Sequence, residues 1–304
     1  MYDLIIIGGG PAGITAGIYA SRKKLKTLLI TKNFVGQVGK ISEIDNWPGF
    51  EKISGMELMK KLLSHLKRFE TEIKEGEDVK ELKKQGEIFE IETKRGEKFS
   101  SRAVVITSGR IPRLLGVAGE KEFLGRGVST CSICDAPFFK DKIVVVIGGG
   151  NAGFRTALDL ISYAQKIYIF EASSKVRADE IFQEKAKESG KVEIMLNTKV
   201  LEIKGKDKVE GLFYQDLASQ EKKELAAEGI FIEIGSIPVT AFLKNLVEFN
   251  ERGEIIINPK TCETKLPGLF AAGDVTDVEY KQLIIAAGEG AKAALSAYNY
   301  LQMK

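Results

Sequence analysis

The sequence predicts an α/β protein that contains two strand–helix–strand units of the same kind. Each unit begins with a short apolar strand, passes through a G-x-G-x-x-G turn into a helix rich in small residues, and ends in a second apolar strand. A further stretch near the C-terminus, LPGLFAAGDVTD, has the composition of a strand that runs into an acidic loop. Glycines at this spacing between a strand and a helix are typical of Rossmann-like dinucleotide-binding domains, so two such domains are expected.

The composition is that of an ordinary globular protein. A chain of 304 residues, 44% hydrophobic, is long enough for two domains with separate cores. The 45 basic and 42 acidic residues are interspersed and leave a net charge of only +3, which argues against a nucleic-acid-binding surface. The charged stretch 74–99 is expected to form a solvated β-meander. The longest apolar runs are as short as strands and the N-terminus has no signal-peptide pattern, so we expect no membrane segment and a cytoplasmic location.

The first unit begins at the N-terminus. The apolar strand Leu4 to Ile7 leads into Gly8, Gly10 and Gly13, and a second apolar strand spans Thr27 to Ile30. The first two glycines allow a tight turn and a close approach of backbone N–H groups to a pyrophosphate, while the third lets the helix pack on the strand. Thr31 stands near the position where an acidic residue often binds ribose.

The second unit repeats the pattern from Ile143. The strand Ile143 to Ile147 leads into Gly148, Gly150 and Gly153, and a later strand, Ile167 to Phe170, ends on Glu171. Glu171 lies close to the offset at which a carboxylate accepts hydrogen bonds from a ribose diol. Two dinucleotide sites in one chain usually hold a flavin and a nicotinamide, between which hydride moves.

The stretch CSICDA contains two of the three cysteines. Structural zinc normally takes four clustered ligands, and the sequence offers only the scattered Cys131, Cys134, Cys262 and His65, so no metal site is expected. A disulfide that closes four residues restricts the unfolded chain little. A redox-active dithiol is therefore favoured for Cys131 and Cys134. His65 lies among lysines in a helix-period stretch and is expected at the surface.

The C-terminal segment supplies a second possible flavin contact. Gly273-Asp274 follows an apolar stretch and would place a carboxylate within reach of a flavin's ribityl hydroxyls. Taken alone, the segment is equally typical of a strand followed by a helix whose N-cap is Asp. Beside the N-terminal glycine motif, flavin binding is favoured.

Across nearly its whole length the chain resembles the low-molecular-weight thioredoxin reductases. The resemblance lies in GGGPAG at the N-terminus, DNWPGF at 45–50, GRGVSTCSICDAPFF at 125–139, GGGNAG at 148–153 and AAGDVTDVEYKQLIIAAGEG at 271–290. It implies an FAD-dependent enzyme whose dithiol lies in the nicotinamide-type domain, just before the glycine turn.

The resemblance also implies roles for the residues of CSICDA. Hydride would pass from nicotinamide to the flavin, and electrons would reach the disulfide through Cys134, the sulfur nearer the flavin. Cys131 would attack the disulfide of thioredoxin or of a similar protein, and Asp135 would be the acid that protonates a leaving thiolate. Cys262 matches no redox position of the family.

Motifs and resemblance together assign the nucleotide-binding residues. For FAD they are Gly8, Gly10, Pro11, Ala12, Gly13, Gly36, Gln37, Asn46, Gly109, Gly273, Asp274, Lys281 and Gln282. For the nicotinamide nucleotide they are Gly148, Gly150, Asn151, Ala152, Gly153, Glu171 and Arg177.

The chain departs from the family where arginines usually clasp the 2′-phosphate of NADPH. The chain has Glu171, Ala172 and Ser173 there, and the one arginine that follows closely is Arg177. A carboxylate repels a 2′-phosphate and binds a ribose diol, so NADH is favoured over NADPH. Because some family members take electrons from ferredoxin or another donor, a ferredoxin-dependent enzyme is the first alternative. Lys281 in place of the usual Arg keeps its charge but loses the planar fork.

The expected organisation is an FAD-binding domain of two segments, 1–114 and 244–304, with a nicotinamide-type domain, 115–243, inserted between them. The resemblance implies a homodimer. Two further functions stay open. One is a flavoprotein that reduces something other than thioredoxin, such as a glutaredoxin-like protein, or that is a peroxiredoxin's reductase domain, and the other is a non-enzymatic FAD- or NAD-binding redox sensor.

Overall fold

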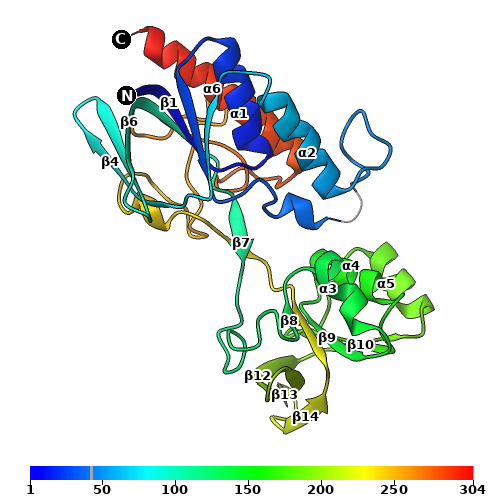
Figure 1. Cartoon of the computed structure of the whole chain (residues 1–304). Coiled ribbons are helices and arrows are strands. Elements are labelled where there is room, and N and C mark those ends of the chain that lie inside the picture. The colour runs from blue at the N-terminus through cyan, green and yellow to red at the C-terminus, as the bar shows by residue number, and fades with distance from the viewer. Residues whose placement is uncertain (42–43, 304) are drawn as a thin grey trace. The chain divides into compact units, whose positions relative to one another are not determined.

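The computed structural model describes residues 1–41 and 44–303, except the side chains of Lys40, Ile133 and Cys134. The chain forms two compact units, which we call unit 1 (Met1–Ile111 with Ile237–Lys304) and unit 2 (Pro112–Ser236) (Figure 1). Both are α/β, so the predicted fold class is confirmed, and unit 2 is inserted between the two segments of unit 1.

Unit 1 is built on a seven-stranded sheet. Its strands are β1 (Tyr2–Ile7), β2 (Thr27–Thr31), β3 (Glu72–Glu75), β4 (Val79–Gln85), β5 (Ile88–Thr93), β6 (Lys98–Ile106) and β17 (Leu269–Ala271). The order is β3-β2-β1-β6-β5-β4, and β17 pairs with β6. Strands β3, β2, β1, β6 and β17 are parallel, whereas β4, β5 and β6 form an antiparallel meander. The charged middle stretch therefore forms the predicted β-meander.

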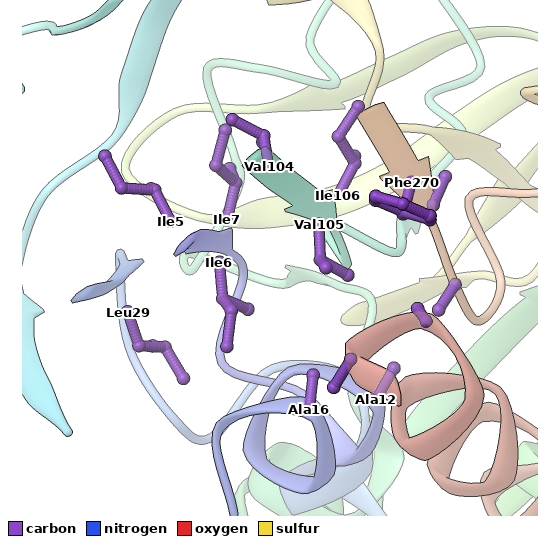
Figure 2. Packing of buried hydrophobic residues seen from close by; sticks show 14 of the residues in the cluster. Ile5, Ile6, Ile7, Ala12, Ala16, Leu29, Val104, Val105, Ile106 and Phe270 are labelled. Atoms are coloured by element: carbon purple, nitrogen blue, oxygen red, sulfur yellow. The ribbon is translucent and has the colours of Figure 1, made fainter. Parts of the chain in front are cut away.

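Three helices accompany this sheet: α1 (Pro11–Arg22), α2 (Gly55–Leu66) and α6 (Leu283–Gln302). In Figure 2, Ile6 and Val105 point to the side of α1, where Ala12 and Ala16 lie, while Ile5, Ile7 and Val104 point to the opposite side. Both sets are buried, as expected for parallel strands covered on both faces. Short 3₁₀ turns, η1 (Val38–Lys40) and η3 (Ala241–Leu243), complete the unit.

Unit 2 is built on a second, five-stranded parallel sheet. Its strands are β8 (Val128–Ser129), β9 (Ile143–Ile147), β10 (Lys166–Phe170), β11 (Val192–Met195) and β15 (Gly229–Ile232), in the order β11-β10-β9-β15-β8. The helical elements are α3 (Ser132–Asp135), η2 (Ala136–Phe139), α4 (Asn151–Leu160) and α5 (Glu180–Glu188). A three-stranded antiparallel sheet, β12 (Thr198–Gly205), β13 (Val209–Asp216) and β14 (Lys222–Ala226), belongs to the same unit.

The chain passes between the units through two short strands, β7 (Arg110–Pro112) and β16 (Ser236–Pro238), which pair with each other. Two hydrogen bonds flank this pair. Val239 N donates to Gly109 O at 3.0 Å within unit 1, and Arg113 N donates to Gly235 O at 2.9 Å within unit 2.

The strands predicted around both glycine motifs are confirmed, with ends that differ by two residues at most. At the C-terminal segment the structure excludes one of the two alternatives, the helix cap. Leu269–Ala271 is a strand, but α6 begins only at Leu283 and its N-cap is Gln282, so Asp274 is not a helix cap. His65 is exposed on α2, as predicted. Among the helices of the described chain, none is both long and apolar enough to span a membrane.

Candidate functional site

The glycine turn after β1 leaves open backbone at the start of α1. A Cβ on Gly8, at φ +116°, would lie 2.3 Å from Thr107 O, and one on Gly13 would lie 1.9 Å from Gly8 O. A Cβ on Gly10 would meet no described heavy atom within 4 Å. The outer glycines are thus required for packing, whereas the middle one borders free space at a helix N-terminus. That space fits a pyrophosphate, which such backbone N–H groups bind.

Thr31, at the end of β2, uses its hydroxyl within the protein. Its Oγ1 donates to Asn33 O at 2.8 Å, and Asn33 Oδ1 accepts from Gly36 N at 2.9 Å. Gly36 adopts φ +50°, and a Cβ added there would have no described atom within 4 Å. The predicted contacts Gly36 and Gln37 therefore lie in an exposed turn after β2.

The segment after β17 lies beside the first turn of α1. A Cβ on Gly273 would lie 3.2 Å from the Cβ of Ala12, and one on Gly290 of α6 would lie 2.0 Å from Ala12 O. Gly273 N donates to Glu289 Oε2 at 2.8 Å. The fold thus joins the N-terminal glycine motif and the C-terminal motif, which the sequence separates by more than half of its length.

Asp274 and Lys281 belong to a charged cluster that the sequence did not reveal. Glu254 Oε1 accepts from Arg110 Nη1 at 2.7 Å and lies 3.1 Å from Lys281 Nζ, while Glu254 Oε2 accepts from Asn250 Nδ2 at 2.7 Å. Burial raises the pKa of Glu254, but the hydrogen bonds from Asn250 and Lys281 outweigh it and lower that pKa overall. A carboxylate so paired stays charged.

Burial raises the pKa of Asp274, and the charges of Lys281 and Arg110 oppose the rise. Nearby, Asn46 Nδ2 donates to Gln282 Oε1 at 3.4 Å, which joins two predicted flavin contacts from distant segments. Gly109, at φ +64°, has no described neighbour within 4 Å of a Cβ position. Every residue assigned to FAD lies in unit 1.

In unit 2, the candidate site lies at one edge of the parallel sheet. The ends of four strands meet there because β8, β15, β9 and β10 all run parallel. Ser129 ends β8 just before Cys131, Glu233 follows β15, Gly148 follows β9 and Glu171 follows β10. Ligands of open parallel sheets bind at this carboxyl edge. The dithiol segment and the glycine turn are therefore separated in the sheet by β15 alone.

The glycine turn after β9 repeats the geometry of the first. A Cβ on Gly148, at φ +124°, would lie 2.2 Å from Glu233 O, and one on Gly153 would lie 1.9 Å from Gly148 O. A Cβ on Gly150 would meet no described atom within 4 Å. Asn151 is held at the start of α4, where its Oδ1 accepts from Asp179 N at 2.7 Å.

Glu171 is buried and bound to the turn itself. Gly149 N donates to Glu171 Oε2 at 2.8 Å, and Ser173 N and Oγ donate to Oε1 at 2.9 and 2.6 Å. Burial raises the pKa of Glu171, but the hydrogen bonds from Ser173 and Gly149, with the charge of Arg177, lower it overall. The structure thus presents a carboxylate beside the second glycine turn.

Cys131 is disulfide-bonded and only 8% exposed. Its backbone is fixed on both sides, because Cys131 N donates to Ser129 Oγ at 3.0 Å and Asp135 N donates to Cys131 O at 3.2 Å. The side chain of Cys134 lies outside the described residues. Asp135 is half-buried at the end of α3.

Cys262 is a free, fully buried thiol in unit 1. Burial raises its pKa to about 12. A thiol that stays protonated at neutral pH is a poor nucleophile, so Cys262 is suited to packing rather than to exchange.

A family model described as pyridine nucleotide-disulphide oxidoreductase matches residues 2–290. The F component of the alkyl hydroperoxide reductase of Pseudomonas aeruginosa is 41% identical over 304 residues, which cover 99% of this chain but 58% of that protein. The thioredoxin reductase of Lactococcus lactis (FR conformation) is similar to the whole chain with a TM-score of 0.93 and 36% identity, and all of that chain is covered. The thioredoxin reductase of T. acidophilum has a TM-score of 0.89 and 37% identity, and 98% of each chain is covered.

Proposed function

The chain belongs to the pyridine nucleotide-disulphide oxidoreductase family, and from that membership we propose that it is a thioredoxin reductase-like enzyme. In this proposal electrons pass from a small donor through FAD and the Cys131/Cys134 disulfide to a disulfide of thioredoxin or a similar protein. The observation that carries it is the sheet edge of unit 2, where the disulfide-bonded Cys131 and the glycine turn follow strands separated by β15 alone.

Unit 1 has the features that would hold FAD. The free space at Gly10 suits the pyrophosphate, and Asp274, Lys281 and Gln282 from the C-terminal motif are the polar groups assigned to the rest of the cofactor. When bound, FAD would supply the two-electron chemistry that links a nicotinamide to a disulfide. The protein's own part is to bind the phosphates through backbone N–H groups and to orient the cofactor through these side chains.

The dithiol residues of unit 2 perform the exchange with the partner. Reduction of one disulfide to two thiols takes two electrons and two protons, and attack by the Cys131 thiolate on the partner forms a mixed disulfide that Cys134 resolves. Asp135 is the proposed acid that gives a proton to the leaving sulfur. Ser129 supports this chemistry by fixing the backbone of Cys131.

For the donor, we propose NADH. Glu171 accepts three hydrogen bonds from Gly149 and Ser173, and its lowered pKa keeps it charged, which favours a ribose diol over a 2′-phosphate. Reduced ferredoxin is the second candidate, because the arginines expected for NADPH are absent from the sequence between Glu171 and Ser173.

The partner and the setting are part of the same proposal. A thioredoxin-like partner and a homodimer are what the family resemblance implies, and the cytoplasmic location expected from the sequence is proposed with them. The hydroperoxide reductase component among the relatives favours a second partner class, a disulfide protein of peroxide reduction. The chain spans 58% of the length of that relative, so neither its activity nor its partners transfer directly.

An anaerobic titration tests the donor and the dithiol together. Flavin absorbance is followed with NADH, NADPH and reduced ferredoxin in turn, for the wild type, Cys131→Ser and Cys134→Ser. We expect NADH to bleach the flavin in all three proteins, and thioredoxin reduction to require both cysteines. Protein that cannot be reconstituted with FAD would overturn the proposal, and bleaching by ferredoxin alone would select the second donor.

A further inference from the structure

Two carboxylates and two hydroxyls form a polar row next to the dithiol segment of unit 2. Ser132, the residue after Cys131, donates from Oγ to Asp159 Oδ2 at 2.7 Å. Thr156 Oγ1 donates to Glu233 Oε1 at 2.9 Å and lies 3.5 Å from Ser132 Oγ. Ser132 and Thr156 are buried, so these hydroxyls depend on protein partners.

The shortest bond of the row joins α3 to α4. Asp159 and Thr156 are one turn apart on α4, and their neighbours Phe154, Ala157 and Leu160 pack in an apolar cluster. A carboxyl group at the margin of such a cluster is costly to bury unless it is hydrogen-bonded. Burial raises the pKa of Asp159, and the Ser132 hydrogen bond and the Arg155 charge offset the rise only in part.

Arg155, on α4 itself, is a charge that lowers the pKa of Asp159. From α5, the Phe182 ring lies 5.1 Å from the Arg155 guanidinium. Elements η2, β9, β10 and β15 contribute apolar side chains to the cluster beneath α4, and Glu233 after β15 is bound by Thr156. Asp159 therefore stands out as the carboxyl bound to the segment between the cysteines.

We propose that Asp159 is a positioning residue for the dithiol, which it reaches through Ser132, and that its charge sets how strongly the reduced cysteines hold their protons. This inference rests on the proposed function in one respect, that Cys131 is half of the redox disulfide. A serine hydroxyl has a single proton to donate, and Ser132 uses it in the hydrogen bond to Asp159, so it cannot donate to a thiolate at Cys131. A carboxylate bound to the residue next to Cys131 adds a negative charge, which disfavours the thiolate further.

The test measures the dithiol equilibrium without donor or protein partner. The purified protein is equilibrated with dithiothreitol buffers between about pH 5.5 and 8.5, a range that spans the ionisation of ordinary thiols. Dithiothreitol forms its cyclic disulfide and passes two electrons and two protons to the protein disulfide. After acid quenching, alkylation in denaturant and mass measurement separate oxidised chains, in which only Cys262 reacts, from reduced chains, in which all three cysteines react.

For Asp159→Asn, we expect the reduced-to-oxidised ratio at about pH 8 to rise three- to tenfold, because loss of the charge lowers the thiol pKa by up to about one unit. Near pH 5.5 the two proteins should agree, since the thiols are protonated in both. Asp207→Asn, the same change in an exposed turn of unit 2, should match the wild type. In a Ser132→Ala background the Asp159→Asn effect should shrink, because the residue that transmits it is gone.

A ratio that changes equally at every pH would show a structural role alone and overturn the inference, as would an unchanged ratio. If the Asn variant does not fold, Asp159→Ser, also uncharged, carries the same expectation. A shifted ratio in a protein that fails to reduce thioredoxin would leave this inference standing while the proposed function fails.

Discussion

At the scale of single residues, Glu171 is the side chain on which the choice of nucleotide depends. Its carboxylate accepts hydrogen bonds from Gly149 and Ser173 and is held charged by them. We expect Glu171→Arg to shift the ratio of NADPH to NADH rates by about 100-fold, since a close unpaired charge costs a few kcal/mol in specificity. Rapid-mixing measurement of flavin reduction at equal nucleotide concentrations gives this ratio.

Glu171→Gln is the matched control, because it keeps the shape and removes the charge. It should lower the preference for NADH without creating one for NADPH. The lowered pKa of Glu171 also means that the wild-type preference should hold from about pH 6 to 8, where the carboxylate stays ionised. Faster reduction by NADPH in the wild type would contradict the assignment.

The position of Glu171 could be predicted from the sequence because the lengths of strand, turn and helix fix its offset from Gly148. The partners of Lys281 could not be predicted. Glu254 and Arg110 meet across 144 residues, and no local pattern relates them. The same holds for Ser132 and Asp159, whose contact depends on how α3 lies against α4.

At the scale of elements, the three glycines of each strand–turn–helix unit have two different roles. The outer two are needed for packing, and the middle one borders the space proposed for the nucleotide. Gly10→Ala should weaken FAD binding by about tenfold or more, since a methyl group would enter the open space while the fold keeps its contacts. Gly13→Ala should instead destabilise unit 1 by about 1–3 kcal/mol, because its Cβ would overlap Gly8 O. Flavin retention on dialysis and urea unfolding measure the two effects.

The corresponding pair in unit 2 should show the same division. Gly150→Ala should weaken binding of the nicotinamide nucleotide, and Gly153→Ala should destabilise unit 2. Equal loss of stability in Gly10→Ala and Gly13→Ala would argue against the division. The strands and helices around both glycine motifs were predictable because their apolar patterns are strong. The two-residue strand β8 was not, since so short a segment has no period to detect, although it places Cys131 at the sheet edge.

At the scale of the whole molecule, each unit has its own apolar core and is expected to respond to its own ligand. One cluster lies wholly in unit 1, and two lie wholly in unit 2. We expect FAD to raise the melting temperature of unit 1 and NADH that of unit 2, because about 100-fold excess over the dissociation constant adds roughly 2.7 kcal/mol to the unit that binds. Trp47, the sole tryptophan, reports on unit 1 by fluorescence.

Circular dichroism of the whole chain follows both transitions. Gly150→Ala should abolish the shift of melting temperature caused by NADH and leave the shift caused by FAD unchanged. A single transition raised equally by either ligand would mean that the units unfold together.

The existence of two domains was predictable from the repeated glycine motif. Their assignment to FAD and to a nicotinamide nucleotide, and the boundaries at 114 and 243, stay predictions.

The paired strands β7 and β16 bring the two ends of unit 2 next to each other, so the whole unit could be removed or replaced. Arg113 N and Gly235 O, near its two ends, are 2.9 Å apart, and Val239 N and Gly109 O, on the unit 1 side, are 3.0 Å apart. A short turn could therefore join residues 109 and 239 and leave unit 1 as a continuous chain. A loop across 113 and 235 could equally close unit 2, so that its ends are opened elsewhere by circular permutation. The same geometry would allow a foreign domain with adjacent termini to be grafted in its place.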